Sequence, residues 1–173
     1  MVWSYETVIS MSDIKIYSFD KCPYAQRTRM ALIEKGLDFE LIEIDVYNKP
    51  EWFHEISPYG KVPVIVHEGK TIFESAIINE YLDERYPEVA LMPSDLYERA
   101  RARIWMDYCS NYYLPACTRL LRDHKNEEAQ EQNLKRIKER LLYIEKECFE
   151  ANEDGVFWMG KKLTLVDLHY APF

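Results

Sequence analysis

Apolar and polar positions alternate and then switch to helical spacing in the stretch that organises the chain, residues 13–36. Residues 14–17 alternate and predict a short strand. A helix is predicted to begin after Cys22, because Pro23 suits the first helical position, and to end at Gly36. Cys22 would then stand at the N-terminus of this helix. Free backbone N–H groups and the helix dipole favour a thiolate at that position.

The pattern continues with a second strand, a short helix, two strands and a helix. Residues 39–44 form the second strand, and a crossover this short predicts parallel pairing with the first. Residues 62–66 and 71–73 are joined by a connection of hairpin length, which predicts an antiparallel pair. The closing helix is predicted to run from an N-cap at Ser75 to about Tyr86. The fold class of this part is therefore α/β, in the order βαβαββα.

Helical spacing dominates the second half of the chain. One long helix is predicted from Tyr97 to about His124, with an interruption or kink at Pro115, and another over residues 126–152. The second half is therefore expected to be an all-α domain. The expected division is an extension at residues 1–11, an α/β domain at 12–87, a linker at 88–96 and a helical domain at 97–173.

A further helix is predicted to begin at Leu165. Thr164, followed by Asp167 three positions later, has the form of a capping box, with Leu163 and Leu168 as its hydrophobic staple. This segment is apolar nearly all round, which is typical of a buried central helix. Because few residues follow the cap, we expect a helical domain that is truncated at its C-terminus or covered by a neighbouring subunit.

The charge and the hydropathy of the chain bear on whether it binds nucleic acid, crosses a membrane or is secreted. The net charge of the 173 residues is −8 and the pI is about 5.1, with no basic stripe of interleaved aromatic residues, so a nucleic-acid partner is not expected. No apolar run approaches the ~20 residues of a membrane span. Residues 1–10 lack the basic and apolar segments of a secretory signal.

The four cysteines do not have the spacing of a zinc site, so no metal is expected. Cys22 is either a small buried thiol or a reactive one, and its predicted place between a strand and a helix favours the reactive thiol. Cys109, Cys117 and Cys148 are interpreted as thiols of the core or of a groove. Free thiols fit a reducing cytoplasm.

Two further features suggest a ligand. Glu74 and Ser75 precede a helix, and besides simple capping they offer a carboxylate to an ammonium and a helix N-terminus to a carboxylate. Lys49, after the second strand, is either a surface lysine or a partner for a second carboxylate. With Cys22 these residues would fit a peptide that has an amino-acid head, a central thiol and a distal carboxylate. Glutathione has this arrangement.

The chain resembles the glutathione transferases, and the omega class most of all. The resemblance covers about residues 12–173 and implies a thioredoxin-like N-terminal domain and an all-helical second domain. The stretches that carry it are residues 22–29, 48–52, 57–63 and 73–77, together with the helix-capping motif at 164–167.

The resemblance also implies roles for single residues. Cys22 would form a mixed disulfide with glutathione, and the expected reactions are thiol transfer or dehydroascorbate reduction. Conjugation of electrophiles would be weak at most, because a cysteine thiolate competes with glutathione as the nucleophile. Pro63 would follow a cis peptide bond, whereas the pattern alone leaves a trans proline in an edge strand open. We also expect a homodimer. The residues expected to hold glutathione are Lys49, Val62 (through its backbone), Pro63, Glu74 and Ser75.

Two interpretations stay open at this point. Trp105, Tyr108 and Tyr112 share one helical face and would line a groove for a small disulfide or electrophile, or else belong to the core. Residues 74–86, 91–93 and 165–172 are also similar to the stringent starvation protein A family, non-catalytic regulators that bind RNA polymerase. Cys22, Lys49 and Glu74 together favour the enzyme.

Overall fold

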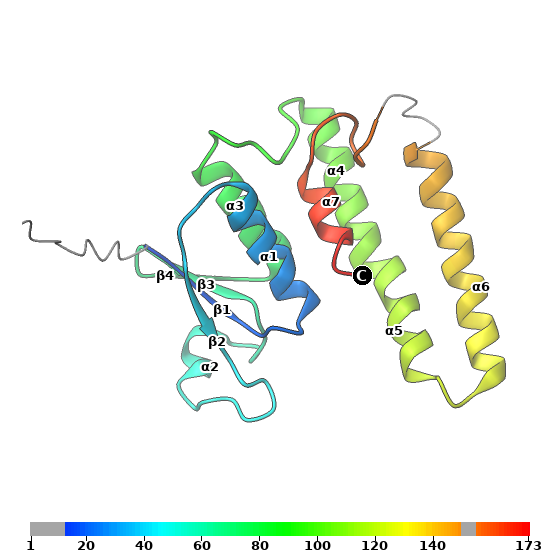
Figure 1. The fold of residues 1–173 in the computed structure, drawn as a ribbon, viewed down its shortest axis with the longest axis horizontal. Coiled ribbons are helices and arrows are strands. Elements are labelled where there is room, and N and C mark those ends of the chain that lie inside the picture. The colour runs from blue at the N-terminus through cyan, green and yellow to red at the C-terminus, as the bar shows by residue number, and fades with distance from the viewer. Residues whose placement is uncertain (1–12, 150–154) are drawn as a thin grey trace, which may run out of the picture.

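The computed structural model describes residues 13–149 and 155–173, and the expected extension at residues 1–11 lies outside them. The first half of the chain forms a four-stranded mixed sheet with the strand order β2-β1-β3-β4 (Figure 1). The predicted parallel and antiparallel pairs are both confirmed. The strands are β1 (Ile14–Ser18), β2 (Glu40–Glu43), β3 (Val64–His67) and β4 (Lys70–Phe73).

Helices cover both faces of this sheet. α1 (Pro23–Glu34) and α3 (Ser75–Arg85) lie together on one face (Figure 1), and α2 (Phe53–Ile56) packs on the other. Because successive side chains of a strand point to opposite faces, Ile65 joins the core under α1 and α3, whereas its neighbour Val64 packs with Phe53.

A long helical rod begins the second half of the chain. It consists of α4 (Leu96–Tyr108), a π-helical turn (Cys109–Tyr113) and α5 (Leu114–Arg122). The predicted interruption is confirmed, and it lies in the turn directly before Pro115. Because proline has no N–H for the carbonyl one turn earlier, the regular hydrogen-bond ladder fails at this point.

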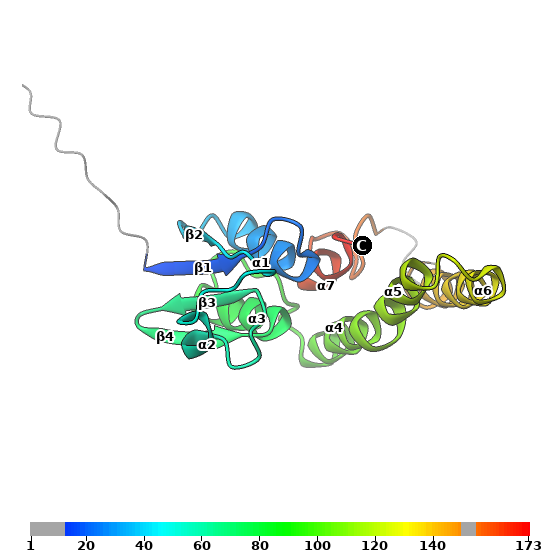
Figure 2. The ribbon, with the colours of Figure 1, turned by 90° about the horizontal axis from the view of Figure 1, so that it is seen from below.

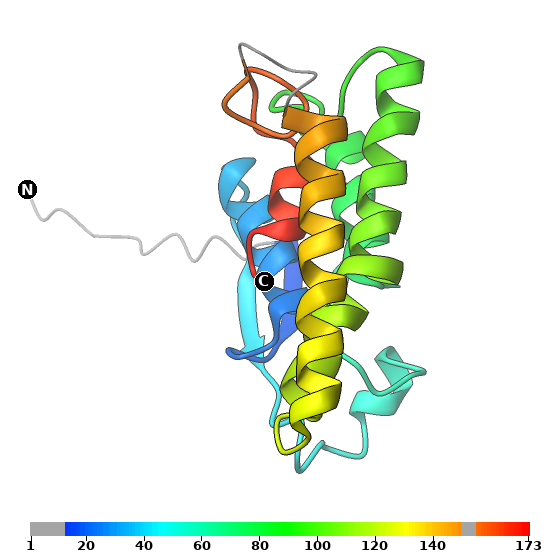
Figure 3. The same cartoon turned by 90° about the vertical axis from the view of Figure 1, so that its right-hand side faces the viewer.

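α6 (Glu127–Ile144) runs back alongside this rod and ends in a second π-helical turn, Glu145–Phe149 (Figure 3). The Asn126 side chain caps α6 by accepting a hydrogen bond from the Ala129 N–H at 3.0 Å. Ile144 is buried in the core, whereas Leu134 and Leu141 on the same helix are about half exposed.

α7 (Leu165–Tyr170) lies beside α1 and α4 (Figures 1 and 2). The predicted capping box is present, since Asp167 accepts hydrogen bonds from both the N–H and the hydroxyl of Thr164, at 2.8 and 2.7 Å. Leu165 and Val166 are buried in a core that also includes Ala31 of α1 and Trp105 of α4. α7 therefore joins the two halves of the molecule.

α3 ends at Arg85 and α4 begins at Leu96. The division into domains predicted at residues 88–96 stays a prediction. No helix in the described part of the chain is long and apolar enough to cross a membrane.

Candidate functional site

Cys22 occupies the N-cap position of α1, at the end of the loop that leaves β1. Its backbone is extended, and its carbonyl accepts the hydrogen bond of the Gln26 N–H at 3.0 Å. The thiol is half-buried and donates to the Val62 carbonyl at a Sγ to O distance of 3.8 Å. The fold thus brings Cys22 against a residue 40 positions later, on the approach to β3.

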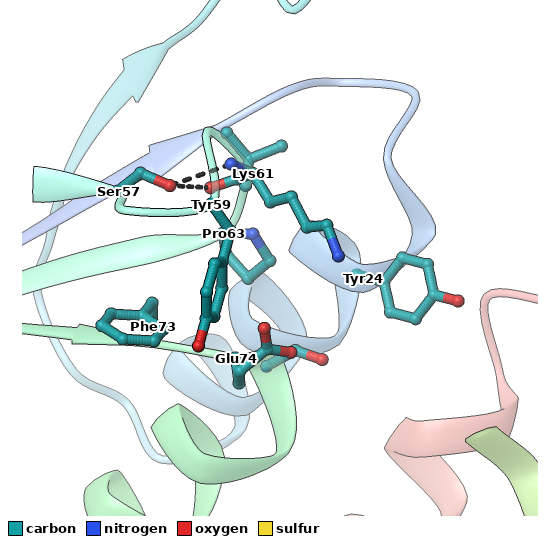
Figure 4. Close-up of a pocket in the computed structure, with 9 residues that line it drawn as sticks. Tyr24, Ser57, Tyr59, Lys61, Pro63, Phe73 and Glu74 are labelled. Carbon is teal, nitrogen blue, oxygen red and sulfur yellow. Dashed lines mark hydrogen bonds between the residues drawn. The ribbon is translucent and has the colours of Figure 1, made fainter. Parts of the chain in front are cut away.

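Two adjoining cavities flank this contact. The first, the Glu74 cavity, has a volume of about 290 Å³ and lies between Tyr59, Phe73 and the start of α3 (Figure 4). The second, the lysine cavity, has a volume of about 400 Å³ and lies beside Cys22. Three residues line both cavities, namely Tyr24, Lys61 and Val62.

All six residues predicted for catalysis and tripeptide binding line this pair of cavities. Cys22 and Lys49 line the lysine cavity, and Val62 lines both. The Val62–Pro63 peptide bond is cis, as the resemblance implied. The remaining three predicted residues, Pro63, Glu74 and Ser75, line the Glu74 cavity.

The position predicted for Ser75 is wrong by one residue. Glu74 holds the N-cap position of α3, Ser75 is the first helical residue, and neither makes a side-chain capping hydrogen bond. Glu74 has a φ of 68°, in the left-handed region that non-glycine residues rarely adopt. Such outliers cluster at ligand-binding and catalytic sites. The exposed carboxylate of Glu74 and the free N–H groups of the first turn of α3 therefore face the same cavity.

The two cavities differ in charge. Glu74 and Lys61 line the first, whereas Lys21, Lys49 and Lys61 line the second, and no described acidic side chain lines the second cavity. An ammonium is therefore favoured beside Glu74 and a carboxylate beside the lysines.

The loop that carries Lys61 is fixed by Ser57. The Ser57 hydroxyl accepts a hydrogen bond from the Lys61 N–H at 2.9 Å and donates one to the Lys61 carbonyl at 2.8 Å (Figure 4). Gly60 has a φ of +60°, and a Cβ there would come within 2.8 Å of the His54 ring. A larger residue at this position would therefore displace the loop beside Cys22.

Sequence reasoning did not identify Tyr24, Lys21 or Lys61 as part of the site. Tyr24 and Lys61 lie inside the matched stretches 22–29 and 57–63, so position within a motif was the available signal. Lys21 directly precedes Cys22 in a loop, where a lysine carries no signal of its own.

Arg27 lies behind Tyr24 and is only 1% exposed. Its guanidinium is 5.0 Å from the ring centroids of Tyr24 and Phe173, and its Nε donates to the His169 carbonyl at 2.8 Å. Burial lowers the pKa of Arg27. Burial, together with this cation, also lowers the pKa of His169 to about 3. Arg27 thus links Tyr24 to His169 in α7 and to Phe173 after the end of that helix.

The remaining thiols lie among the helices. Cys109 and Cys148 are buried, and desolvation raises the pKa of each to about 12. Cys117 is partly buried, and all four cysteines are free. Within residues 13–149 and 155–173, no group of three or more His, Cys, Asp or Glu side chains is placed to hold a metal ion.

The aromatic residues predicted to line a groove lie on α4 and on the π-helical turn after it, near Tyr143 of α6. Trp105 is 6% exposed and belongs to the core, whereas Tyr112 is half exposed and stacks on Tyr108 at 5.3 Å. The Tyr143 ring of α6 contacts Trp105 and Tyr108. None of the three lines the two cavities beside Cys22, and their role in substrate binding stays a prediction.

Comparisons with known proteins place the site in context. The family model for the glutathione S-transferase N-terminal domain matches residues 16–90. Rat glutathione S-transferase omega-1 is 38% identical over 161 residues, which cover 92% of this chain and 65% of the rat protein. Glutathione S-transferase U28 of Arabidopsis thaliana is 36% identical, and the match covers 94% of this chain and 71% of that protein. The chain spans less than two thirds of the length of the rat, mouse and pig omega-1 proteins.

Solved structures agree with these relatives. Glutathione transferase Omega 3C of Trametes versicolor superposes with a TM-score of 0.84 at 31% identity, over 92% of this chain and 71% of that one. Rice GST1, solved in complex with glutathione, superposes with a TM-score of 0.84 at 32% identity, over 94% and 73% of the two chains.

Proposed function

Because the chain belongs to the glutathione S-transferase family, we propose that it binds glutathione across the two cavities and uses Cys22 for glutathione-dependent thiol transfer. The observation that carries the proposal is the order of charges. Glu74 and a helix N-terminus stand at one end, and Lys21 and Lys49 stand at the other. Lys61 and Val62 line both cavities, and the Cys22 thiol contacts Val62. Glutathione carries an amino-acid head, a thiol and a distal carboxylate in the same order.

The γ-glutamyl head belongs in the Glu74 cavity. Its ammonium pairs with the Glu74 carboxylate, and its α-carboxylate accepts hydrogen bonds from the N–H groups of the first turn of α3, beside Ser75. Pro63 forms part of the wall of this cavity. The glycine carboxylate belongs in the lysine cavity, where Lys49 has the support of Lys21 and Lys61.

The glutathione sulfur belongs beside Cys22, next to the Val62 backbone. A Cys22 thiolate attacks the glutathionyl sulfur of a mixed disulfide, takes up the glutathionyl group and expels the other thiolate. A second glutathione then attacks the glutathionyl sulfur on Cys22. This step forms glutathione disulfide and regenerates the free Cys22 thiolate. Small disulfides and dehydroascorbate are the proposed oxidised substrates, and conjugation of electrophiles is weaker because Cys22 itself is the nucleophile.

The free state of all four cysteines supports a location in the cytoplasm. We also propose a homodimer, whose mass in solution is measurable by sedimentation.

Binding of glutathione and of its two halves tests the proposal. The Glu74→Gln substitution removes the partner of the ammonium and should weaken glutathione and γ-glutamylcysteine by about 1.5–3 kcal/mol, the range for a hydrogen bond to a charged group. It should leave cysteinylglycine unchanged. The Lys49→Gln substitution should weaken glutathione and cysteinylglycine by about 0.5–1 kcal/mol, since two other lysines remain, and should leave γ-glutamylcysteine unchanged. Titration calorimetry measures the nine affinities, those of wild type and the two variants for each of the three ligands.

Glu88→Gln and Lys138→Gln remove exposed charges outside both cavities and serve as matched controls. If wild-type chain binds none of the three peptides, or if each substitution weakens both halves equally, the proposed binding mode is wrong. Failure to bind glutathione would favour the non-catalytic alternative.

A further inference from the structure

A third cavity, of about 300 Å³, lies where the start of α1 faces α5. Tyr24 lines this α5 cavity as well as both cavities of the candidate glutathione site. Tyr24 is therefore the lining residue that the α5 cavity shares with the space beside Cys22. The other lining residues are Ser110, Leu114, Pro115, Thr118, Arg119 and Arg122.

One face of a single helical stretch forms this wall. Residues 110, 114, 118 and 122 recur every fourth position, so their side chains point the same way. Leu114 is 2% exposed and gives the wall an apolar floor. Its polar groups are two hydroxyls and two guanidinium groups, and no acidic side chain among the described residues lines it.

The charge of this wall is incompletely neutralised. Arg122 pairs with Asp123, at an Nε to Oδ1 distance of 3.0 Å, and the other Asp123 oxygen accepts from Asn133 at 3.3 Å. Arg119 makes no side-chain hydrogen bond or ion pair with any residue in the described part of the chain. Both arginines also lie in the last turn of α5, where the helix dipole stabilises cations. That interaction uses no N–H donor, so the donors of Arg119 remain available to a ligand.

We infer that the α5 cavity holds the second substrate and selects one that carries a carboxylate, an inference that rests on the proposed function. A guanidinium binds a carboxylate through two parallel N–H groups, which fixes the direction of the substrate as well as its charge. With its carboxylate on Arg119, the substrate extends past Tyr24 towards Cys22.

A carboxylate-bearing disulfide RSSR is reduced in three thiol–disulfide exchange steps. Glutathione first exchanges with RSSR in solution to give the mixed disulfide GSSR and one RSH. The Cys22 thiolate attacks the glutathionyl sulfur, so that the S–S bond of GSSR breaks, a Cys22–glutathione disulfide forms and RS⁻ leaves from the α5 cavity. A second glutathione thiolate attacks the glutathionyl sulfur of this disulfide, which releases glutathione disulfide and returns Cys22 as a thiolate. Two glutathiones are oxidised and one RSSR is reduced.

Three symmetric disulfides of different charge test the inference. They are dithiodipropionate, which is anionic, bis(2-hydroxyethyl) disulfide, which is neutral, and cystamine, which is cationic. Wild-type chain should show the highest kcat/KM with the anionic disulfide and the lowest with cystamine. Arg119→Gln should lower the ratio of kcat/KM for the anionic to the neutral disulfide about tenfold, as expected for one lost charge-assisted contact. Arg119→Glu should reverse the order of the anionic disulfide and cystamine.

Lys138→Gln removes a cation from α6, outside this cavity, and should leave all the ratios unchanged. If the neutral disulfide is reduced but the anionic one is not preferred, or if Arg119→Gln leaves the ratio unchanged, the charge selection is wrong while the thiol transfer stands. If Tyr112→Ala lowers the ratio and Arg119→Gln does not, the second substrate binds near Tyr112 instead. If wild-type chain reduces none of the three disulfides, the proposed function itself fails.

Discussion

At the scale of single residues, Glu74 has a backbone conformation that is unfavourable for a residue other than glycine. Its φ of 68° places a charged side chain in a region that costs a non-glycine residue about 1–3 kcal/mol. Glycine would fit this turn between β4 and α3 without strain, but it would supply no carboxylate to the cavity. The proposed pairing with a cationic ligand group would account for a glutamate at this strained position.

His169 is the residue that most directly couples stability to pH. It is buried, with its Nε2 2.9 Å from the Ser110 hydroxyl, and burial together with Arg27 lowers its pKa to about 3. The unfolded chain has an ordinary histidine pKa of about 6.5 and therefore binds a proton that the folded chain does not. The free energy of unfolding should consequently fall as the pH drops below about 6.5, by about 2 kcal/mol between pH 7 and pH 5.

Urea unfolding at each pH measures this effect. His169→Gln keeps a side-chain partner for Ser110 but cannot titrate, so its loss of stability between pH 7 and pH 5 should be smaller by about the same 2 kcal/mol. The exposed His124 does not face this buried network, and His124→Gln is the matched control. Parallel pH profiles for wild type and His169→Gln would mean that His169 is not held neutral in the fold.

At the scale of elements, the capping box stabilises α7, the helix whose packing joins the two halves of the molecule. Asp167 accepts hydrogen bonds from Thr164 and also from the Trp158 N–H at 2.8 Å. Thr164→Ala should lower the free energy of unfolding by about 1–2 kcal/mol. Asp167→Ala should lower it by more, because two partly buried N–H groups, those of Trp158 and Thr164, lose their acceptor.

The double substitution distinguishes capping from a general loss of packing. Because Thr164 and Asp167 bond each other, the loss in the double variant should be smaller than the sum of the two single losses. Asn126→Ala removes the cap of α6, a separate helix end, and its effect should add to that of Thr164→Ala. Strict additivity of Thr164→Ala and Asp167→Ala would contradict the capping box as the source of the stability.

Elements that depend on local patterns could be predicted from the sequence. The strands, their pairing and the start of α7 follow from alternation, hairpin length and the capping motif. The π-helical turn before Pro115 could only be predicted as an interruption, since the way a helix adapts to a missing N–H depends on its packing partners. The N-cap at Glu74 instead of Ser75 depends on a positive φ that the residue type does not indicate.

At the scale of the whole molecule, the site combines segments that only the fold brings together. The loop after β1, the segment after β2, the approach to β3 and the junction of β4 with α3 each contribute residues to it. Cys22, Lys49 and Glu74 could be identified from the sequence because each stands where a strand or helix ends. Lys61 had only its place in a matched motif as a signal, and Lys21 had none. The α5 cavity could not be predicted, since the residues that line it are distant in sequence.

The central claim is that glutathione binds with its sulfur against Cys22. Brief treatment of the native chain with glutathione disulfide at neutral pH, followed by peptide mapping, tests it most directly. Cys22 should carry the glutathionyl group first, because Cys109 and Cys148 are buried and burial raises the pKa of each to about 12. Glu74→Gln should slow this modification about tenfold, through lost binding, while Glu88→Gln should not. Modification of Cys117, Cys109 or Cys148 before Cys22, or a rate at Cys22 that does not depend on Glu74, would contradict the account.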